Sequence, residues 1–269
     1  MKGKFDIAYF SADIVISRSL PTYSGGIGFL AGEQIKSGGT VVKNVTGYDL
    51  SKLVSGSYGT LCALTEVTLK VLPKYEYQET FCIYGLTHNE AINFFSTAMD
   101  TSLEISGACF YPADNTGFFR LNDIKQNNSI LSLRVEGPKT SVQERIQQLR
   151  KIFVASDYSV LDIFQSKAFW NLSKNLELFK NTNEIKYFID WAGGLIWLST
   201  KDVETISKMR IFSVKNNGHL TIYKSDDNHR RTEEFLTCGD TNFKILSSKI
   251  KKSFDPNLIL NPGKMYAGI

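Results

Sequence analysis

The chain has 269 residues, of which 42% are hydrophobic, 12% aromatic and 22% charged, and its net charge is +4. That length suffices for one large or two small domains with a buried core. The charge excess is mild and no DNA- or RNA-binding motif accompanies it, which argues against a nucleic-acid partner, and no apolar run is long enough to span a bilayer.

The cysteines and histidines do not predict a metal site. The four cysteines are far apart, no C-x-x-C pair exists, and no histidine lies at ligand spacing from a cysteine. Scattered thiols without a signal peptide predict a cytoplasmic location. The short basic clusters, Lys249-Lys251-Lys252 and residues 229–231, are interpreted as solvated surface.

Residues 1–36 show the least regular pattern. Residues 5–16 have the composition of a strand, and residues 21–32 contain Gly26-x-Gly28-x-x-Ala31. This spacing loosely matches a dinucleotide fingerprint, but the preceding residues do not form an apolar strand. A flexible glycine loop is the favoured interpretation.

Residues 37–73 are the most informative stretch. A glycine pair, Gly38-Gly39, opens it, and Asp49 is a good N-cap for a short helix that begins at Leu50. A second glycine cluster, residues 56–59, ends that helix, and the alternation at 67–71 predicts a half-buried strand that Pro73 stops. The loop is either a tight structural connection or a cofactor loop with exposed N–H groups; the residue pattern leaves both open.

The same stretch resembles the vanillyl-alcohol-oxidase flavoprotein superfamily with its PCMH-type FAD-binding domain, and within it the FAD-binding subunits of bacterial glycolate oxidase. Residues 38–49 match Gly-Gly-x-Val-x-Lys-Asn-Val-x-Gly-Tyr-Asp, and residues 56–66 match Gly-Ser-x-Gly-x-Leu-Gly-x-x-Thr-Glu. Cys62 stands where relatives usually have glycine, which narrows the space for a flavin. The resemblance implies these FAD contacts: Gly38, Gly39, Lys43, Asn44, Gly47, Tyr48, Gly56, Ser57, Gly59, Thr60 and Leu61. For Lys43, a surface lysine is an equal alternative.

Family members also carry an N-terminal subdomain whose glycine loop takes the FAD pyrophosphate. Nothing in this sequence resembles that subdomain. We therefore expect the chain alone to bind FAD weakly or not at all.

The pattern changes after Pro73. Strands are predicted at 77–84, 104–110, 117–121, 129–136 and 158–163, and helices at 89–99, 142–153 and 166–178. The first of these helices carries Ala91, Ile92, Phe95 and Ala98 at helical spacing, and Thr140 is the expected cap of the second. This order predicts a ferredoxin-like α+β layer.

Further family-like segments follow. Residues 185–199 predict a hairpin around Ala192-Gly193-Gly194, and Asp190-Trp191 matches a family motif there. After a helix at 201–209, residues 218–221 resemble the family's Gly-His-Ala-Thr strand. A last helix at 243–253 leads into residues 254–266, whose Asn-Pro-Gly-Lys sequence is a family signature. The resemblance implies that Asn261 lies near the flavin; a simple C-terminal turn is the alternative.

The predicted fold class is therefore α+β: a partial PCMH-type FAD-binding domain at 1–75, then a ferredoxin-like α+β domain at 76–269. The tail at 254–266 is expected to return to the flavin domain. His219 is interpreted as a core or interface histidine in an apolar strand. With three dispersed histidines, the chain does not supply the base and metal set that superfamily members use on 2-hydroxy acids.

Two functions stay open. The resemblance implies an FAD-binding subunit of a glycolate (2-hydroxy-acid) oxidase complex, in which glycolate is oxidised to glyoxylate and electrons pass through flavin to an iron–sulfur partner. Its expected partners are a larger flavin-containing catalytic subunit and an iron–sulfur subunit, with any membrane association arising through the complex. The alternative is a non-catalytic interaction subunit that no longer binds FAD. The aromatic segment 164–179, with Phe169, Trp170 and Phe179, is the candidate partner surface; a core helix is the competing interpretation.

Overall fold

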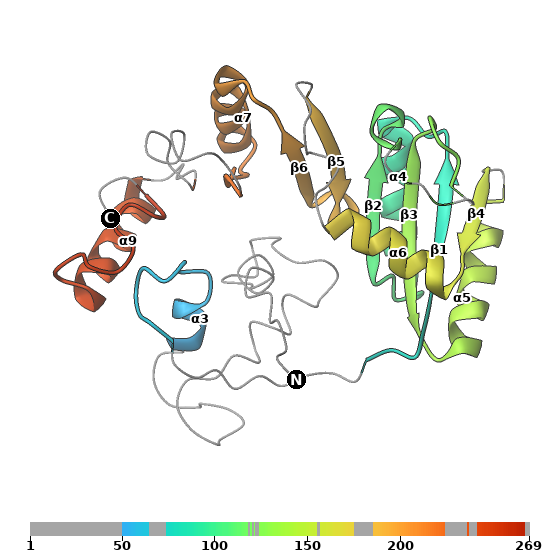
Figure 1. Cartoon of the computed structure of the whole chain (residues 1–269), viewed down its shortest axis with the longest axis horizontal. Helices are drawn as coiled ribbons and strands as arrows, with labels where there is room; N and C mark the ends of the chain where they lie inside the picture. The colour runs from blue at the N-terminus through green and yellow to red at the C-terminus, as the bar shows by residue number, and fades with distance from the viewer. Residues whose placement is uncertain are drawn as a thin grey trace. The chain divides into compact units, whose positions relative to one another are not determined.

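The computed structural model describes residues 50–64, 74–117, 119, 121, 124–154, 157–174, 185–223, 236 and 241–266. These residues fall into two compact units, which are described separately. Residues 74–201 contain the sheet, and the other unit contains residues 50–64 together with 202–266. Figure 1 labels the elements.

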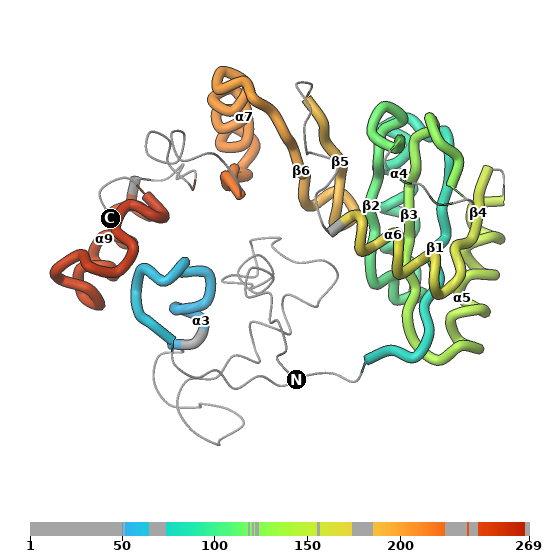
Figure 2. Tube along the Cα trace, viewed as in Figure 1, coloured from blue at the N-terminus to red at the C-terminus, as the bar shows by residue number. Residues whose placement is uncertain are grey.

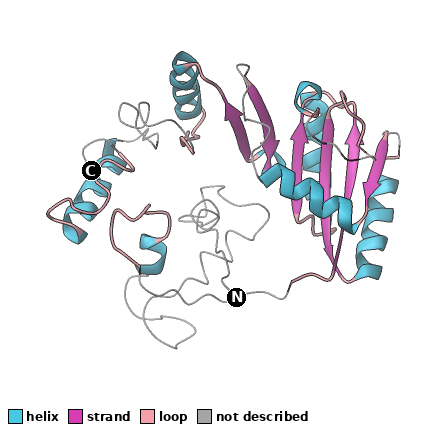
Figure 3. Ribbon diagram, viewed as in Figure 1, coloured by secondary structure: helices cyan, strands magenta, loops and turns pink. Residues whose placement is uncertain are grey.

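The first unit contains a six-stranded antiparallel sheet. Its strands are β1 (Tyr77–Tyr84), β2 (Gly107–Tyr111), β3 (Ile130–Gly137), β4 (Tyr158–Leu161), β5 (Lys186–Asp190) and β6 (Leu195–Ser199), in the order β4-β1-β3-β2-β5-β6. Figure 3 draws them in magenta. The first four strands have the order and connections of a ferredoxin-like layer, so the predicted α+β class and ferredoxin-like layer are confirmed. The predicted hairpin is also confirmed, and it extends the sheet beyond β2.

Helices cover both faces of this sheet. The helices α4 (His88–Met99) and α5 (Lys139–Ile152) pack on one face, and α6 (Ile163–Lys174) packs on the other (Figure 1). Because strand residues alternate between faces, Phe81 packs with α4 and α5, whereas its neighbour Cys82 packs on the side of α6. The Cα trace in Figure 2 follows the chain through these elements.

Local sequence explains where α4 and α5 begin. In α4, Thr87 and Glu90 form a capping box, which satisfies the first N–H groups of the helix. The predicted cap of α5, Thr140, is wrong: α5 begins at Lys139, and Pro138 precedes it without a side-chain cap. Pro138 takes a φ of −61° and a ψ of 141°, the extended conformation of an N-cap residue, and its ring fixes that φ.

Other sequence predictions need correction. Ile92 is 53% exposed, so the buried face of α4 consists of Ala91, Phe95 and Ala98. The strand β2 begins at Gly107, because Glu104 takes a φ of 49° that interrupts an extended chain. No described residue of 117–121 lies in a strand; Phe119 is instead buried and stacks on Phe169 with ring centroids 4.5 Å apart.

The candidate partner surface at 164–179 is also wrong for two of its three named aromatic residues, Phe169 and Trp170. Phe169 is fully buried and Trp170 is 8% exposed. The Trp170 indole donates a hydrogen bond to the Thr80 hydroxyl at 2.9 Å, and the Arg134 guanidinium lies 4.8 Å from the indole ring. These contacts make α6 a core helix. Residues 175–179 lie outside the described residues.

The second unit contains α3 (Leu50–Val54), α7 (Val203–Lys215) and α9 (Thr241–Phe254). His219 is exposed and lies outside any strand, so its interpretation as a core histidine is wrong, whereas an interface role stays a prediction. Thr221 forms an isolated bridge with Leu236. The predicted strand at 67–71 lies outside the described residues. Contacts between Cα atoms group residues 202–253 with residues 50–64 in one compact unit. The sequence analysis predicts a different division, with a domain boundary at residue 75. That predicted division stays a prediction. No helix among the described residues is long and apolar enough to cross a membrane.

Candidate functional site

A loop after α3 forms the first part of the site. Gly56 and Gly59 take φ values of 75° and 69°, and Tyr58 between them takes 51°. Glycine adopts this left-handed region without a steric penalty, which explains its place in the loop. The Thr60 hydroxyl donates to the Ser57 carbonyl at 2.7 Å and the Thr60 N–H donates to the same oxygen at 2.9 Å, so the loop is held from within.

The C-terminal tail forms the second part. Asp255 follows α9, and its carboxylate accepts the N–H groups of Ile259 at 3.0 Å and Leu260 at 2.7 Å. The chain then turns through Asn261, whose φ is 42°, and the Lys264 N–H donates to the Asn261 carbonyl at 3.2 Å. Asparagine tolerates this conformation better than most residues do. One carboxylate therefore organises the turn that presents Asn261.

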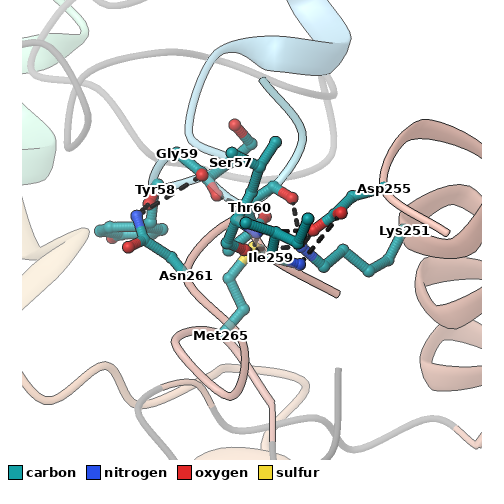
Figure 4. Close-up of polar contacts among 10 residues, drawn as sticks. Ser57, Tyr58, Gly59, Thr60, Lys251, Asp255, Ile259, Asn261 and Met265 are labelled. Carbon is teal, nitrogen blue, oxygen red and sulfur yellow. Dashed lines mark hydrogen bonds and ion pairs between the residues drawn. The ribbon is translucent and has the colours of Figure 1, made fainter. Parts of the chain in front are cut away.

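A buried lysine joins the two parts. The ammonium of Lys251 donates to the carbonyls of Thr60 and Leu260 and to the Asp255 carboxylate, each at 2.6 Å (Figure 4). The side chain of Lys251 is only 2% exposed and that of Asp255 only 6%. The hydrogen bond from Lys251 lowers the pKa of the Asp255 carboxyl below its ordinary value, despite burial, which opposes the shift.

Asn261 makes the second link between loop and tail. Its side-chain Nδ2 donates to the Tyr58 carbonyl at 3.0 Å and approaches the Gly59 carbonyl at 3.4 Å. A Cβ added to Gly59 would lie 2.9 Å from that Nδ2, closer than real Cβ atoms come. Gly59 is thus required twice, for its backbone conformation and for the approach of Asn261.

The loop and the tail enclose an open cleft of about 440 Å³. Nine residues line it: Val54, Ser57, Gly59, Cys62, Ala63, Leu64, Ile259, Leu260 and Asn261. Most of these are apolar or small, and Ser57 and Asn261 add polar groups. A mostly apolar cleft with a few polar atoms suits a flat organic ring system.

The structure brings some of the predicted site residues to this cleft. Ser57, Gly59 and Asn261 line it, whereas Thr60 and Leu61 are buried and, like Gly56, are not among the lining residues. Six predicted residues lie outside the described residues: Gly38, Gly39, Lys43, Asn44, Gly47 and Tyr48. Their roles, and those of the cleft residues toward a cofactor, stay predictions.

The sequence analysis missed the buried pair. Lys251 was interpreted as part of a solvated basic cluster, and it is instead one of the largest fully buried side chains in the described part of the chain. The signal was its i,i+4 spacing from Asp255 at a helix end, because residues at that spacing share one helix face. Its neighbours Lys249 and Lys252 are exposed, as expected.

The remaining chemical groups of the described residues do not form a second site. Burial raises the pKa of the Cys82 thiol to about 12 and that of Cys109 well above its ordinary value, so both thiols are unreactive. The exposed His88 pairs with the Tyr187 hydroxyl and stacks on its ring. Over the described ranges, no three His, Cys, Asp or Glu residues gather at metal-binding distance.

Comparison with known proteins agrees with the motifs at this cleft. Glycolate oxidase subunit GlcE of Escherichia coli strain K12 is 30% identical over 253 residues, which cover 88% of this chain and 63% of the relative. The chain is therefore similar to glycolate oxidase subunits over most of its own length. Glycolate oxidase subunit GlcD of Bacillus subtilis strain 168 is 24% identical and matches 88% of the chain and 61% of its own length. The resemblance inferred from the glycine motifs is confirmed.

Two limits define this relationship. The chain spans less than two thirds of the length of these glycolate oxidase subunits, and no protein-family model matches it. Among solved structures, the 4-ethylphenol oxidase of Gulosibacter chungangensis aligns with a TM-score of 0.50 at 12% identity, over 81% of this chain and 58% of that protein. Likeness at that identity concerns the fold alone.

Proposed function

We propose that this chain contributes an FAD-contacting cleft to a 2-hydroxy-acid oxidoreductase complex of the glycolate oxidase type. The observation that carries the proposal is the hydrogen bond from Asn261 to the Tyr58 carbonyl. It joins the two segments, 56–66 and 254–266, that most resemble the flavin-binding subunits. The similarity to the glycolate oxidase subunits GlcE and GlcD supports the substrate class.

The cleft residues fit a flavin in their chemistry. Val54, Leu64 and Ile259 offer apolar surface to a flat ring. The Asn261 amide donates through Nδ2 to the protein backbone, which leaves its oxygen as the group that would accept from a ring N–H. Bound FAD supplies a two-electron acceptor, and the protein's contribution is to hold and orient it. Cys62 lines the cleft at the position where the resemblance leads us to expect glycine.

The proposed reaction moves a hydride from the carbon that bears the hydroxyl of glycolate to the flavin, which gives glyoxylate, while a base takes the hydroxyl proton. Electrons then pass to an iron–sulfur subunit. A larger flavin-containing subunit and that iron–sulfur subunit are the proposed partners. We assign the base to none of the described residues, because His88 pairs with the Tyr187 hydroxyl and His219 is not among the residues that line the cleft.

Co-expression tests the proposal. The chain is produced with and without the two candidate partner subunits, and bound flavin is measured by absorbance after gel filtration. We expect FAD in the complex and glycolate-dependent reduction of a redox dye by the complex. Omission of this chain should lower both. A complex whose flavin content and dye reduction are unchanged when this chain is omitted would identify it as a non-catalytic interaction subunit and overturn the proposal.

A further inference from the structure

The contacts of Lys251 account for every proton of its ammonium group. A lysine ammonium has three N–H donors. Here they meet three acceptors at 2.6 Å each: the Asp255 carboxylate just after its own helix, the Thr60 carbonyl on the loop and the Leu260 carbonyl on the tail. A buried ammonium is costly unless it is paired and hydrogen-bonded, and this one is both.

The arrangement fixes the distance between the two walls of the cleft. The carbonyl oxygens of Thr60 and Leu260 both contact one nitrogen, so they lie within about 5 Å of each other. Thr60 lies between the lining residues Gly59 and Cys62, and Leu260 is itself a lining residue. Any movement of the tail away from the loop must break at least one of these charge-assisted hydrogen bonds.

Asp255 pairs with the Lys251 ammonium and also holds the tail wall of the cleft. Its carboxylate accepts from Lys251 and from the N–H groups of Ile259 and Leu260, both of which line the cleft. Lys251 and Asp255 are not among the lining residues themselves. Their effect on a bound molecule therefore acts through the backbone they hold.

We propose that Lys251 is a positioning residue that sets the opening of the cleft between Gly59 and Asn261 and thereby the fit of the flavin. The second half of this statement rests on the proposed function, whereas the first half does not. Breaking the tie widens the cleft, exposes Cys62 and weakens FAD binding, even where the chain stays folded.

The first experiment needs no flavin. The folded chain is treated with N-ethylmaleimide, and peptide mass spectrometry measures the labelling rate of Cys62, which lines the cleft and is half-buried. Lys251→Met keeps the length of the side chain and removes the donors. We expect it to label Cys62 about tenfold faster than wild type, the order expected for losing a charged hydrogen bond. The matched control is Lys252→Met, at the exposed neighbour in α9, which should label at the wild-type rate.

A double variant separates positioning from stability. Lys251→Met leaves a buried carboxylate without its partner, which destabilises the fold. Lys251→Met with Asp255→Asn removes that charge while the Asn oxygen still accepts an N–H. The double variant should recover thermal stability and keep the fast labelling of Cys62. If the labelling rate returns to wild type together with the stability, or never rises in the single variant, Lys251 is merely structural and the proposal is overturned.

The second experiment adds FAD to the complex and measures how much FAD protects Cys62 from labelling. The variant Lys251→Met should require about tenfold more FAD for half-protection, and Lys251→Arg should restore part of the loss because it keeps charged donors. Equal protection in wild type and Lys251→Met would overturn the proposal. If FAD protects Cys62 in no protein, the proposed function fails, while the labelling comparison still decides whether Lys251 sets the opening.

Discussion

At the scale of single residues, the site depends on positions where the backbone and a neighbour both demand one residue type. Gly59 is such a position, since its φ is 69° and a Cβ would meet Asn261 at 2.9 Å. Gly263 has a similar φ of 72°, but nothing lies within 4 Å of its virtual Cβ. Substituting each glycine in turn therefore distinguishes the cost of backbone strain, which both share, from the cost of steric contact, which only Gly59 has.

The first prediction uses this pair. Gly263→Ala should cost about 1 kcal/mol of unfolding free energy, from strain alone. Gly59→Ala should cost about 1 kcal/mol more, because Asn261 must also leave its hydrogen bond to Tyr58. Urea denaturation measures both. Equal losses would show that the approach of Asn261 contributes nothing to stability.

The second prediction concerns acid. The pKa of Asp255 lies below its ordinary 3.8, so its ion pair contributes stability that is full above pH 3.8 and is lost as the pH falls through the lowered value. Asp255→Asn removes this contribution. The difference in unfolding free energy between wild type and Asp255→Asn should be largest near neutral pH and shrink below pH 3.8. Urea titrations followed by NMR signals of residues 57–61 measure it, and a difference that does not change with pH would contradict the assignment.

Sequence reasoning reached the residues of this site unevenly. Ser57, Gly59 and Asn261 were found because their motifs are long and resemble a known family. Lys251 was missed because a cluster of nearby lysines does not indicate which of them faces the interior of the protein. Its acceptor on Thr60 lies 191 residues away, and no local pattern reports such a contact.

At the scale of elements, the pattern of apolar residues predicted the strands and helices that pack in the sheet unit. The strands β1 and β3 come from runs rich in apolar residues, and α4 repeats apolar residues at helical spacing, so these three elements were predicted within a residue or two at their ends. The start of α5 and the loop at 117–121 were missed. Proline began the helix without a cap, and Phe119 was recruited to the core by stacking on Phe169 instead of by a strand.

The third prediction tests the role of α6. Both Phe169 and Phe164 belong to α6. Phe169 is fully buried, whereas Phe164 is 79% exposed. Phe169→Ala should lower the unfolding free energy by about 3–5 kcal/mol. Phe164→Ala is the matched control and should change it by less than about 0.5 kcal/mol. Thermal unfolding followed by circular dichroism measures both. A small loss of unfolding free energy for Phe169→Ala would contradict the assignment of α6 as a core helix.

At the scale of the whole molecule, the two units differ in the reach of their contacts. Strand β1 pairs with β3 and β4, at most about 80 residues away, whereas the cleft joins residues 57–60 to 251–265. Contacts between residues far apart in sequence form late, because closing the long loop costs entropy before the contacts stabilise the chain.

The fourth prediction follows from that difference. In refolding from urea, amides of β1 and β3 should gain protection from hydrogen exchange before amides of residues 57–61. Pulse-labelling with mass spectrometry measures the order. Because the sheet pairs nearby segments and the cleft does not, simultaneous protection would show that the two units fold as one.

The long tie through Lys251 also has a consequence during synthesis. A ribosome adds about 5–20 residues per second, so a nascent chain waits on the order of 10–40 s between making residue 60 and making residue 251. During that interval the loop has no lysine to hold its Thr60 carbonyl and no Asn261 beside Gly59. During synthesis, Cys62 and the apolar side chains near it are therefore accessible to oxidants, chaperones or an early ligand until residues 251–261 have been made.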